Sequence, residues 1–414
     1  MHRTEFPRLL SRLAALVAVA VVVTLTGCST TGDPDGGGSG GVGSGGVGSG
    51  GAPGADRPGS QPPGRALPAG PAVEVETVAD GLTIPWDVVR DPEGVIVTGE
   101  RGSGTLYAIR GNGERTVVEA GVGDLYDRGE SGLMGMALAA DFATSREVYT
   151  CHSDAAESDN RVTAWTAAED WSALEAPRVL VDGILLAERG LHSGCRILVH
   201  PDGTLYIGTG DAFTGPASQD LDRFSGKILH ITRDGEPAGD TIGDSPVLTY
   251  GHRNVQGLAL RPDSGQIVAS EHGPDVDDEV NLVLPGSNYG WDPNSGGRYD
   301  QNVPMTDTGD FPDAVEAVWR SGAPTLAPGG IAFLDDPAWG EWDGTLAVAM
   351  LKSSQVVLMT LSEDGSTVTR TAAILRGEHG RLRSITHEPG GSLLVTTSNG
   401  GGEDEILRVR PAAG

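Results

Sequence analysis

The pattern of apolar and polar positions changes character near residue 72. Before that point, one continuous apolar run, residues 13–25, is followed by a long stretch rich in Gly, Ser and Pro. After it, short apolar or alternating runs recur, each announced by a turn signal, and helical periodicity is almost absent. The pattern therefore predicts an all-β domain over residues 73–412.

A turn-then-strand unit recurs through this domain. Its clearest copies begin at Asp91, His200, Arg261 and Glu388, and looser copies begin at Asp141 and Trp342. Most copies are spaced by about 45–60 residues, and a Gly/Pro/Asp-rich insertion near 291–325 widens one interval. Six copies with no linker between them favour a six-bladed β-propeller of four-stranded antiparallel blades, and a pair of β-sandwiches is the alternative. Because a propeller binds ligands on its axis, we expect site residues to be scattered along the chain.

The N-terminal segment is typical of a targeting signal. Arg3, Arg8 and Arg12 precede the apolar run, which is too short for a comfortable transmembrane helix. The run ends in LTGC, which resembles a bacterial lipoprotein cleavage box with Cys28 as the lipidated residue; an ordinary signal peptide with an incidental cysteine is the alternative. We expect a signal peptide over 1–27, a disordered linker over 28–72, and an exported, cell-membrane lipoprotein that faces outside the cytoplasm and contacts the membrane only through its lipid.

Charge and cysteine content narrow the range of partners. The net charge of −28 and the pI near 4.5 argue against nucleic acid and against an anionic membrane surface as binding partners.

Cys151 and Cys195 both lie in strand-like segments of a chain expected in an oxidising compartment. A disulfide between them is plausible, and two separate buried thiols are the alternative.

Polar motifs are distributed over the predicted blades in a characteristic order. They read RGESGLMGMAL from Arg128, LHSGCRILVHPDGTLYIGTGDA from Leu191, YGHRNVQGLAL from Tyr250, SEHGPDVDDEVNLVLPGSNYGW from Ser270, MLKSSQ from Met350 and GRLRSI from Gly380. Together they resemble the soluble pyrroloquinoline quinone (PQQ) dependent sugar dehydrogenases, namely the glucose/sorbosone and aldose sugar dehydrogenases. The resemblance covers nearly all of residues 75–410 and implies a six-bladed quinoprotein propeller.

The resemblance implies two cofactors, PQQ and calcium. PQQ carries three carboxylates, which call for fixed cations and amides. The matching cofactor-binding positions are Glu130, Arg253, Asn254, Gln256, His272, Asp278, Lys352, Arg381 and Arg383. The family's catalytic calcium is held by backbone carbonyls that match Gly273 and Pro274, and a second, structural calcium maps to Glu279 and the main chain of Tyr289.

The resemblance also implies a general base. His192 matches the histidine that takes the proton of the sugar hydroxyl, and Asp211 matches the carboxylate that orients it. His252, in YGHRNVQG, is expected to be structural.

Three features depart from the family pattern. The family commonly has Gln at the position of Glu130, and a carboxylate there would repel an anionic quinone unless it were protonated or paired with calcium. Cys195 replaces a Gly or Ser, and His272 is the aldose-type residue where the glucose-specific branch has Gln.

Several residues have a plain alternative interpretation. Arg381 and Arg383 alternate on a predicted strand and could form a solvated face, the Asp-rich stretch before Glu279 could be an acidic loop, and His192 could be structural.

The sequence thus predicts an enzyme that oxidises the C1 hydroxyl of an aldose to a lactone by hydride transfer to PQQ with calcium assistance. It would pass the electrons to a membrane quinone or a redox protein. A propeller that has lost catalysis and binds carbohydrate or protein is the alternative. A calcium-dependent lactonase is less favoured, because no clear set of side-chain carboxylates for the metal is visible.

Overall fold

The structure, a computed structural model, describes residues 66–412. Within this range the regular secondary structure is almost entirely β-strand, with one four-residue helix, α1 (Phe142–Ser145), and one 3-10 helix, η1 (Pro337–Trp342). The predicted all-β class is confirmed. No helix of the described part is long and apolar enough to cross a membrane. The predicted signal peptide, Cys28 and most of the predicted linker lie outside the described residues.

Most of the strands form groups of four, in which consecutive members pair antiparallel. The first two groups are β2 (Pro85–Arg90), β3 (Ile96–Glu100), β4 (Leu106–Ile109), β5 (Arg115–Ala120), and β6 (Leu133–Leu138), β7 (Glu147–Asp154), β8 (Asp159–Ala167), β9 (Ala173–Leu185). A short parallel pairing of β5 with β9 joins these two groups at their outer edges. The next two are β10 (Gly194–Val199), β11 (Leu205–Thr209), β12 (Lys227–Ile231), β13 (Val247–Tyr250), and β14 (Val255–Leu260), β15 (Ile267–Glu271), β16 (Glu279–Leu282), β19 (Trp319–Arg320).

The remaining groups complete the domain. They are β20 (Pro328–Phe333), β21 (Leu346–Met350), β22 (Gln355–Leu361), β23 (Val368–Ile374), and β24 (Leu382–His387), β25 (Leu393–Thr397), β26 (Asp404–Pro411) with β1 (Val73–Leu82). The strand β1 is the first of the domain, yet it pairs with the last, β26, with Val75 opposite Val409. A separate hairpin, β17 (Asn294–Ser295) and β18 (Arg298–Tyr299), projects from the loop between β16 and β19.

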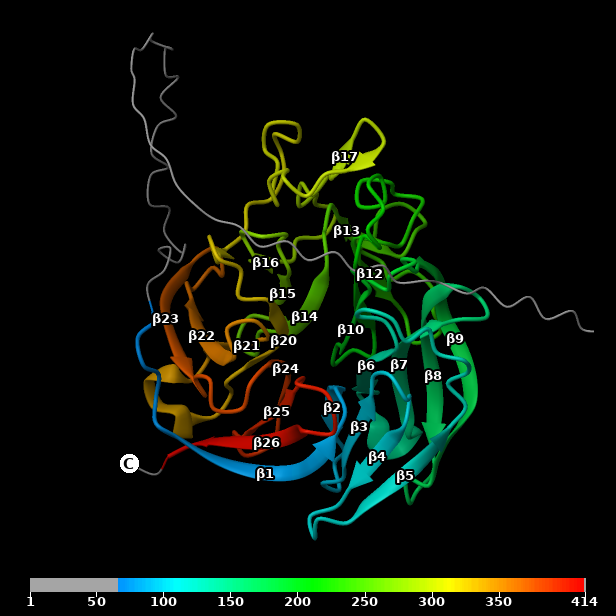
Figure 1. Ribbon diagram of the computed structural model, residues 1–414, viewed down its shortest axis with the longest axis vertical. Helices are drawn as coiled ribbons and strands as arrows, with labels where there is room; N and C mark the ends of the chain where they lie inside the picture. Colours follow the sequence, from blue (N-terminus) through cyan, green and yellow to red (C-terminus); the bar gives the residue numbers. More distant parts are fainter. Residues whose placement is uncertain (1–65, 413–414) are drawn as a thin grey trace, which may run out of the picture. The chain divides into compact units, whose positions relative to one another are not determined.

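The sheets follow one another around an axis, as in a β-propeller (Figure 1). The first strand of each group contacts the first strand of the next, in the cyclic order β2, β6, β10, β14, β20, β24 and back to β2. The second strands are buried over nearly their whole length, and LAVAM of β21 is also wholly apolar, because a sheet lies against each of their faces.

Every copy of the repeated sequence unit occupies the same place in the fold. Each of its copies lies at the turn between the first and second strand of a group. In the copy that begins at His200, the Gly203 amide donates to the His200 carbonyl at 2.9 Å, and Gly203 has φ +91°, which a side chain would disfavour. The Gly of the sequence repeat therefore closes the turn.

The folded part begins earlier than the predicted boundary at residue 73. The Gly70 amide donates to the Ala373 carbonyl, and the Ala373 amide donates to the Pro68 carbonyl, both at 3.0 Å. The last residues of the predicted linker thus pair with β23, because that strand has a free edge.

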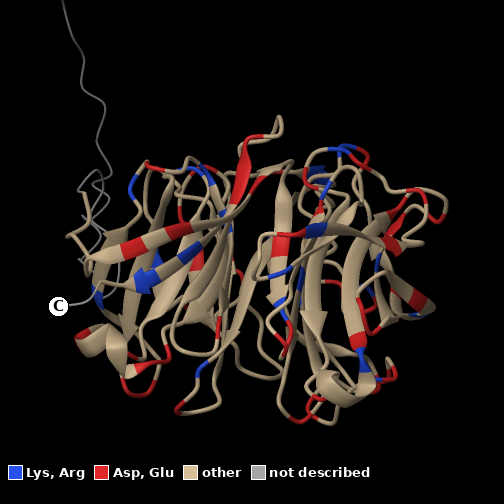
Figure 2. Ribbon diagram, turned by 90° about the horizontal axis from the view of Figure 1, so that it is seen from below, with Lys and Arg blue, Asp and Glu red and all other residues tan. Residues whose placement is uncertain are grey.

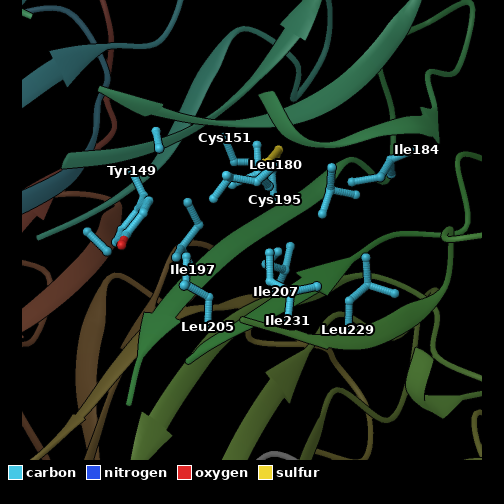
Figure 3. Packing of buried hydrophobic residues seen from close by; sticks show 14 of the residues in the cluster. Tyr149, Cys151, Leu180, Ile184, Cys195, Ile197, Leu205, Ile207, Leu229 and Ile231 are labelled. Carbon is cyan, nitrogen blue, oxygen red and sulfur yellow. A yellow bond between two sulfur atoms is a disulfide. The ribbon is translucent and has the colours of Figure 1, made fainter. Parts of the chain in front are cut away.

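The core lies between neighbouring sheets. One apolar cluster joins the sheet of β6–β9 to the sheet of β10–β13, and it includes Leu180, Ile184, Ile197 and Ile207 (Figure 3). Within it, Cys151 of β7 and Cys195 of β10 form a disulfide with a Cα–Cα distance of 5.5 Å. The two cysteines are therefore bridged rather than separate thiols, and the bridge joins two adjacent sheets.

Acidic and basic side chains are distributed differently. Acidic residues lie mainly in the loops at both ends of the strands (Figure 2). Several arginines are instead buried near the axis, including Arg196, Arg253 and Arg383, each about 5% exposed. An acidic protein thus encloses several buried arginines, which lie among buried carboxylates such as Asp87 and Asp211.

Candidate active site

The predicted acid–base pair is assembled in the structure. His192 Nδ1 lies 2.8 Å from Asp211 Oδ1, and both residues are almost completely buried. Nε2 of His192 makes no hydrogen bond to any residue that the structure describes. With Nδ1 donating to the carboxylate, Nε2 is left as the proton-accepting nitrogen.

The backbone before β10 is folded to present this histidine. His192 has φ +53°, and Gly194 has φ +62°. A Cβ on Gly194 would lie 2.5 Å from the backbone of Thr209, so only glycine fits at that position. The Gly194 amide also donates to Asn254 Oδ1 at 3.1 Å, which links the histidine loop to the next group of strands.

Asp211 accepts further hydrogen bonds from residues that sequence reasoning did not single out. Oδ2 accepts from Trp291 Nε1 at 2.8 Å and from Tyr299 OH at 2.6 Å, while Oδ1 accepts from the Phe213 amide at 2.8 Å. Trp291 and Tyr299 come from the insertion predicted near 291–325. The insertion was recognisable as Gly/Pro/Asp-rich, but nothing in that composition shows which sheet it covers.

A second group of predicted residues forms a polar network beside the pair. Asn254 Nδ2 donates to Glu130 Oε2 at 2.9 Å, and Gln256 Nε2 donates to Asn254 Oδ1 at 3.1 Å. Arg383 NH1 in turn donates to Gln256 Oε1 at 2.8 Å. Glu130, Asn254, Gln256 and Arg383 thus come from three groups of strands and meet at the axis.

Glu130 faces several positive or titratable groups. Burial would raise the pKa of Glu130, but its electrostatic interactions with His192, His272 and Arg383 and the Asn254 hydrogen bond outweigh burial and lower its pKa. Glu130 is therefore an anion at neutral pH in the cofactor-free protein.

The cationic side chains nearby are incompletely satisfied. Burial lowers the pKa of Arg383 to about 9, and Arg101, Arg381 and Arg196 act in the same direction while Glu130 opposes them. The buried Nε atoms of Arg253 and Arg383 and the Nε2 atom of His272 have no hydrogen-bond partner. Burial lowers the pKa of His272 to about 3, so this ring is neutral. Buried donors without acceptors are costly, and an anionic ligand would satisfy them.

Arg253 is anchored at the edge of this network. Its NH1 donates to the His272 carbonyl at 2.9 Å and its NH2 donates to Gln301 Oε1 at 3.0 Å. Its guanidinium lies over the ring of Trp291, 5.6 Å from the centroid.

Asp278 contacts the predicted metal-binding loop and makes no hydrogen bond to the polar network of Glu130, Asn254, Gln256 and Arg383 within the described residues. Its carboxylate accepts from the backbone amides of Gly273, Leu326 and Ala327. Burial raises the pKa of Asp278, and these amides partly offset it. Asp278 therefore fixes the loop that carries Gly273 and Pro274.

Glu279 is buried, and its carboxylate oxygens already accept hydrogen bonds from other side chains. Its carboxylate accepts from Thr306 Oγ1, Arg320 Nε and Asn281 Nδ2 at 3.0–3.3 Å. Burial, together with the charge of Glu271, raises the pKa of Glu279 to about 8. No group of three or more His, Cys, Asp or Glu side chains that could hold a metal occurs within residues 66–412, so a metal at either predicted position would depend on main-chain oxygens.

Two predicted cofactor residues are exposed. Lys352 Nζ donates to Thr325 Oγ1 at 2.9 Å, and Arg381 precedes β24. Because the pairing of β24 with β25 shifts register between Leu382 and Ser384, exposed Arg381 and buried Arg383 do not share one environment. The interpretation of both arginines as a solvated face is wrong for Arg383.

His252 has the expected structural setting. Its Nδ1 lies 2.9 Å from Glu271 Oε1 and its Nε2 lies 2.9 Å from Thr249 Oγ1, and the side chain is completely buried. Glu271 also accepts from the Arg253 amide at 2.8 Å. His252 therefore supports the segment that carries Arg253.

A cavity lies at the other end of the axial strands. It has a volume of about 440 Å³ and is lined by residues late in those strands, such as Val89, Leu138 and Val199. Its floor includes Arg196 and Asp87, which form an ion pair at 2.6 Å. The acid–base pair is not part of this cavity, so cavity volume alone would not have located the site.

Comparison with known proteins shows the family to which the chain belongs. The chain is 31% identical over 362 residues to an aldose sugar dehydrogenase of Escherichia coli, covering 84% of this chain and 95% of that protein. It is similar to the PQQ-bound aldose sugar dehydrogenase from Streptomyces coelicolor, with a TM-score of 0.70, 34% identity, and coverage of 83% of this chain and 99% of that chain. The apo-form of the soluble aldose sugar dehydrogenase from Escherichia coli gives a TM-score of 0.72 at 28% identity, covering 82% of this chain and all of that chain. The family model described as glucose/sorbosone dehydrogenase matches residues 82–408. The chain therefore belongs to the glucose/sorbosone dehydrogenase family.

Proposed function

We propose that this protein is an exported, lipid-anchored quinoprotein that oxidises the C1 hydroxyl of aldose sugars to lactones, using PQQ and calcium. The observation that carries the proposal is the His192–Asp211 pair at 2.8 Å, which lies beside the buried network of Arg253, Asn254, Gln256 and Arg383. A buried imidazole–carboxylate pair suits proton abstraction, and buried arginines suit a carboxylated cofactor.

The residues present fit PQQ. The unpartnered Nε atoms of Arg253 and Arg383 are donors without acceptors, and a tricarboxylate supplies acceptors. Asn254 and Gln256 would hold further cofactor oxygens, and exposed Lys352 and Arg381 would bind from the rim. Glu130 is the exception, because it places a negative charge in the same network.

PQQ, when bound, supplies the ortho-quinone that accepts a hydride. The protein supplies the base: Nε2 of His192 takes the proton of the C1 hydroxyl as that hydride leaves the carbon. Asp211 holds Nδ1 in its protonated form and stabilises the imidazolium that results. The Phe213 and Tyr299 rings, stacked at 4.1 Å beside His192, exclude water from one side of the base.

Calcium would be held by the backbone carbonyls of Gly273 and Pro274. The support is indirect: the amides of Leu326 and Ala327 hold the Asp278 carboxylate, which in turn accepts from the Gly273 amide at 3.0 Å and so positions this loop. A structural calcium would bind at Glu279 and the main chain of Tyr289, where the charge of Glu271 and burial raise the pKa of Glu279 and a bound cation would offset both effects.

We further propose that each group of four strands is one blade of a six-bladed propeller. The support is the correspondence between the sequence repeat and the first turn of every group. Export and lipid attachment rest on the sequence of residues 1–28, and the electron acceptor would be a membrane quinone or a redox protein.

The direct test is titration of the purified domain with PQQ in the presence of calcium, followed by dye-linked oxidation of a panel of aldoses. We expect saturable binding, a change in PQQ absorbance and sugar-dependent dye reduction. Binding of PQQ without oxidation of any aldose would remove the substrate assignment.

A second candidate function follows from Glu130. Its carboxylate occupies hydrogen bonds of Asn254 and Gln256 that a cofactor would use. A propeller that binds carbohydrate or protein without catalysis would fold normally and show no heat of PQQ binding in the same titration.

A further inference from the structure

The insertion between β16 and β19 contributes directly to the acid–base pair. Tyr299, at the end of β18, donates its hydroxyl hydrogen to Asp211 Oδ2 at 2.6 Å, and the hydroxyl oxygen of Tyr299 lies 3.3 Å from His192 Nδ1. The ring of Tyr299 stacks on Phe213, whose own amide donates to Asp211. Two residues later, Gln301 accepts from Arg253 NH2 at 3.0 Å. The segment 294–301 therefore reaches the base on one side and a cofactor-binding arginine on the other.

The donor character of Tyr299 is secure. Burial and the adjacent Asp211 carboxylate both raise the pKa of Tyr299, so its hydroxyl stays protonated over the working pH range. With Trp291 Nε1 and the Phe213 amide, it forms a set of donors around Asp211 in addition to His192. Each donor stabilises the anionic form of the carboxylate.

We propose that Tyr299 is a positioning residue that determines how strongly the Asp211 carboxylate stabilises the protonated form of His192. By withdrawing charge from Asp211, its hydroxyl limits how strongly the carboxylate stabilises the imidazolium, and its ring holds Phe213 against His192. The proposal rests on the assignment of His192 as the general base under the proposed function.

The groups that face this pair come from several elements. His192 precedes β10 and Asp211 follows β11, while Tyr299 and Trp291 belong to the insertion. Glu130, which precedes β6, interacts electrostatically with His192, and Arg253, which precedes β14, interacts with Tyr299. Substitutions at Tyr299 change none of these charges.

The test is Tyr299→Phe, which keeps the ring and removes the donor. In the cofactor-free protein, the ring nitrogens of His192 are followed by NMR across pH. We expect the midpoint of the His192 transition to move upward by about 0.5–1 pH unit, because the less stabilised carboxylate holds the imidazolium more tightly. Trp291→Phe removes the other donor to Oδ2 and should move the midpoint in the same direction.

Enzyme kinetics provide the second measurement. In the protein loaded with PQQ and calcium, Tyr299→Phe should raise kcat by roughly two- to threefold at pH values above the His192 transition, with little change in KM, because a more tightly held imidazolium makes His192 a stronger base. The acidic limb of the pH–rate profile should move upward with the NMR midpoint.

Tyr206→Phe is the matched control. Tyr206 stacks on His230 at 4.0 Å in β11 and β12 and has no contact with Asp211, so both measurements should be unchanged. A Tyr299→Phe protein with wild-type melting temperature and an unmoved His192 transition would overturn the proposal. Absence of aldose oxidation by the wild type would instead refute the proposed function, while the NMR titration would still decide the role of Tyr299.

Discussion

Glu130 and Asn254 are joined by a hydrogen bond of 2.9 Å at the centre of the basic network. The relationship brings a carboxylate to the place where a polyanionic cofactor is expected. It also offsets part of the charge on Arg383 in the cofactor-free protein. Glu130 therefore has opposite expected effects on the stability of the empty protein and on its affinity for PQQ.

Replacement of Glu130 by Gln should separate these effects. The folded-state pKa of Glu130 is lowered from 4.5, so its contribution to stability is present above the unfolded value and is lost as the pH falls through the folded value. At pH 7, Glu130→Gln should lower the melting temperature of the cofactor-free protein and tighten PQQ binding by roughly tenfold, since one like charge is removed. Calorimetry measures the affinity; weaker binding by the variant would show that the Glu130 carboxylate helps to hold the cofactor, directly or through calcium.

Substitution of His192 by Ala should abolish most turnover while keeping the cofactor. Loss of a positioned general base costs roughly 10²–10⁴-fold in rate. PQQ absorbance and affinity should change little, because the arginine network is intact. Turnover within a few-fold of wild type would exclude His192 as the base.

The disulfide should contribute to the stability of the domain. Cys151 and Cys195 enclose a loop with a sequence separation of 44 residues. In the chain-entropy model, closing a loop of that length lowers the entropy of the unfolded chain and so raises the free energy of unfolding by roughly 4 kcal/mol. The double variant Cys151→Ser, Cys195→Ser should unfold at lower urea concentration than the wild type, and reductant should affect only the wild type; equal midpoints without reductant would refute this contribution.

Glu279 should make stability depend on pH. Its folded-state pKa, about 8, lies above the unfolded value of 4.5, so its contribution is fully present below 4.5 and is lost as the pH rises through about 8. With calcium removed by a chelator, the melting temperature of the wild type should fall between pH 5 and pH 9 by more than the melting temperature of Glu279→Gln does. Calcium should reverse that fall in the wild type only, whereas magnesium, which demands a stricter geometry, should not. A calcium response retained by Glu279→Gln would place the ion elsewhere.

The fold was predictable because its signal is local and repeated. Each copy of the turn-then-strand unit needs only a tight turn and a buried strand, and both leave their mark within about ten residues of sequence. The partners of the strands follow from the repeat, so the order of the groups could be inferred. The attachment of Gly70 to Ala373 could not, because pairing with a free edge leaves no pattern in a Gly/Pro-rich segment.

The site was predictable where motifs are contiguous with strands. His192, Asp211, Arg253 and Asn254 adjoin strand ends, and the structure brings them together. Tyr299 and Trp291 were missed because their contact with Asp211 depends on the path of an irregular insertion. The difference between Arg381 and Arg383 depends on a register shift, which simple alternation does not anticipate.

The pairing of β1 with β26 has a consequence for biogenesis. The last sheet is built from both ends of the described chain, so it cannot form until the final residues have been synthesised. Such long-range pairing is slow, since the entropy lost in closing a loop grows with its length. Under the proposed export, closure of the domain would wait until the C-terminal strand has crossed the membrane, and the polypeptide would stay open during transit.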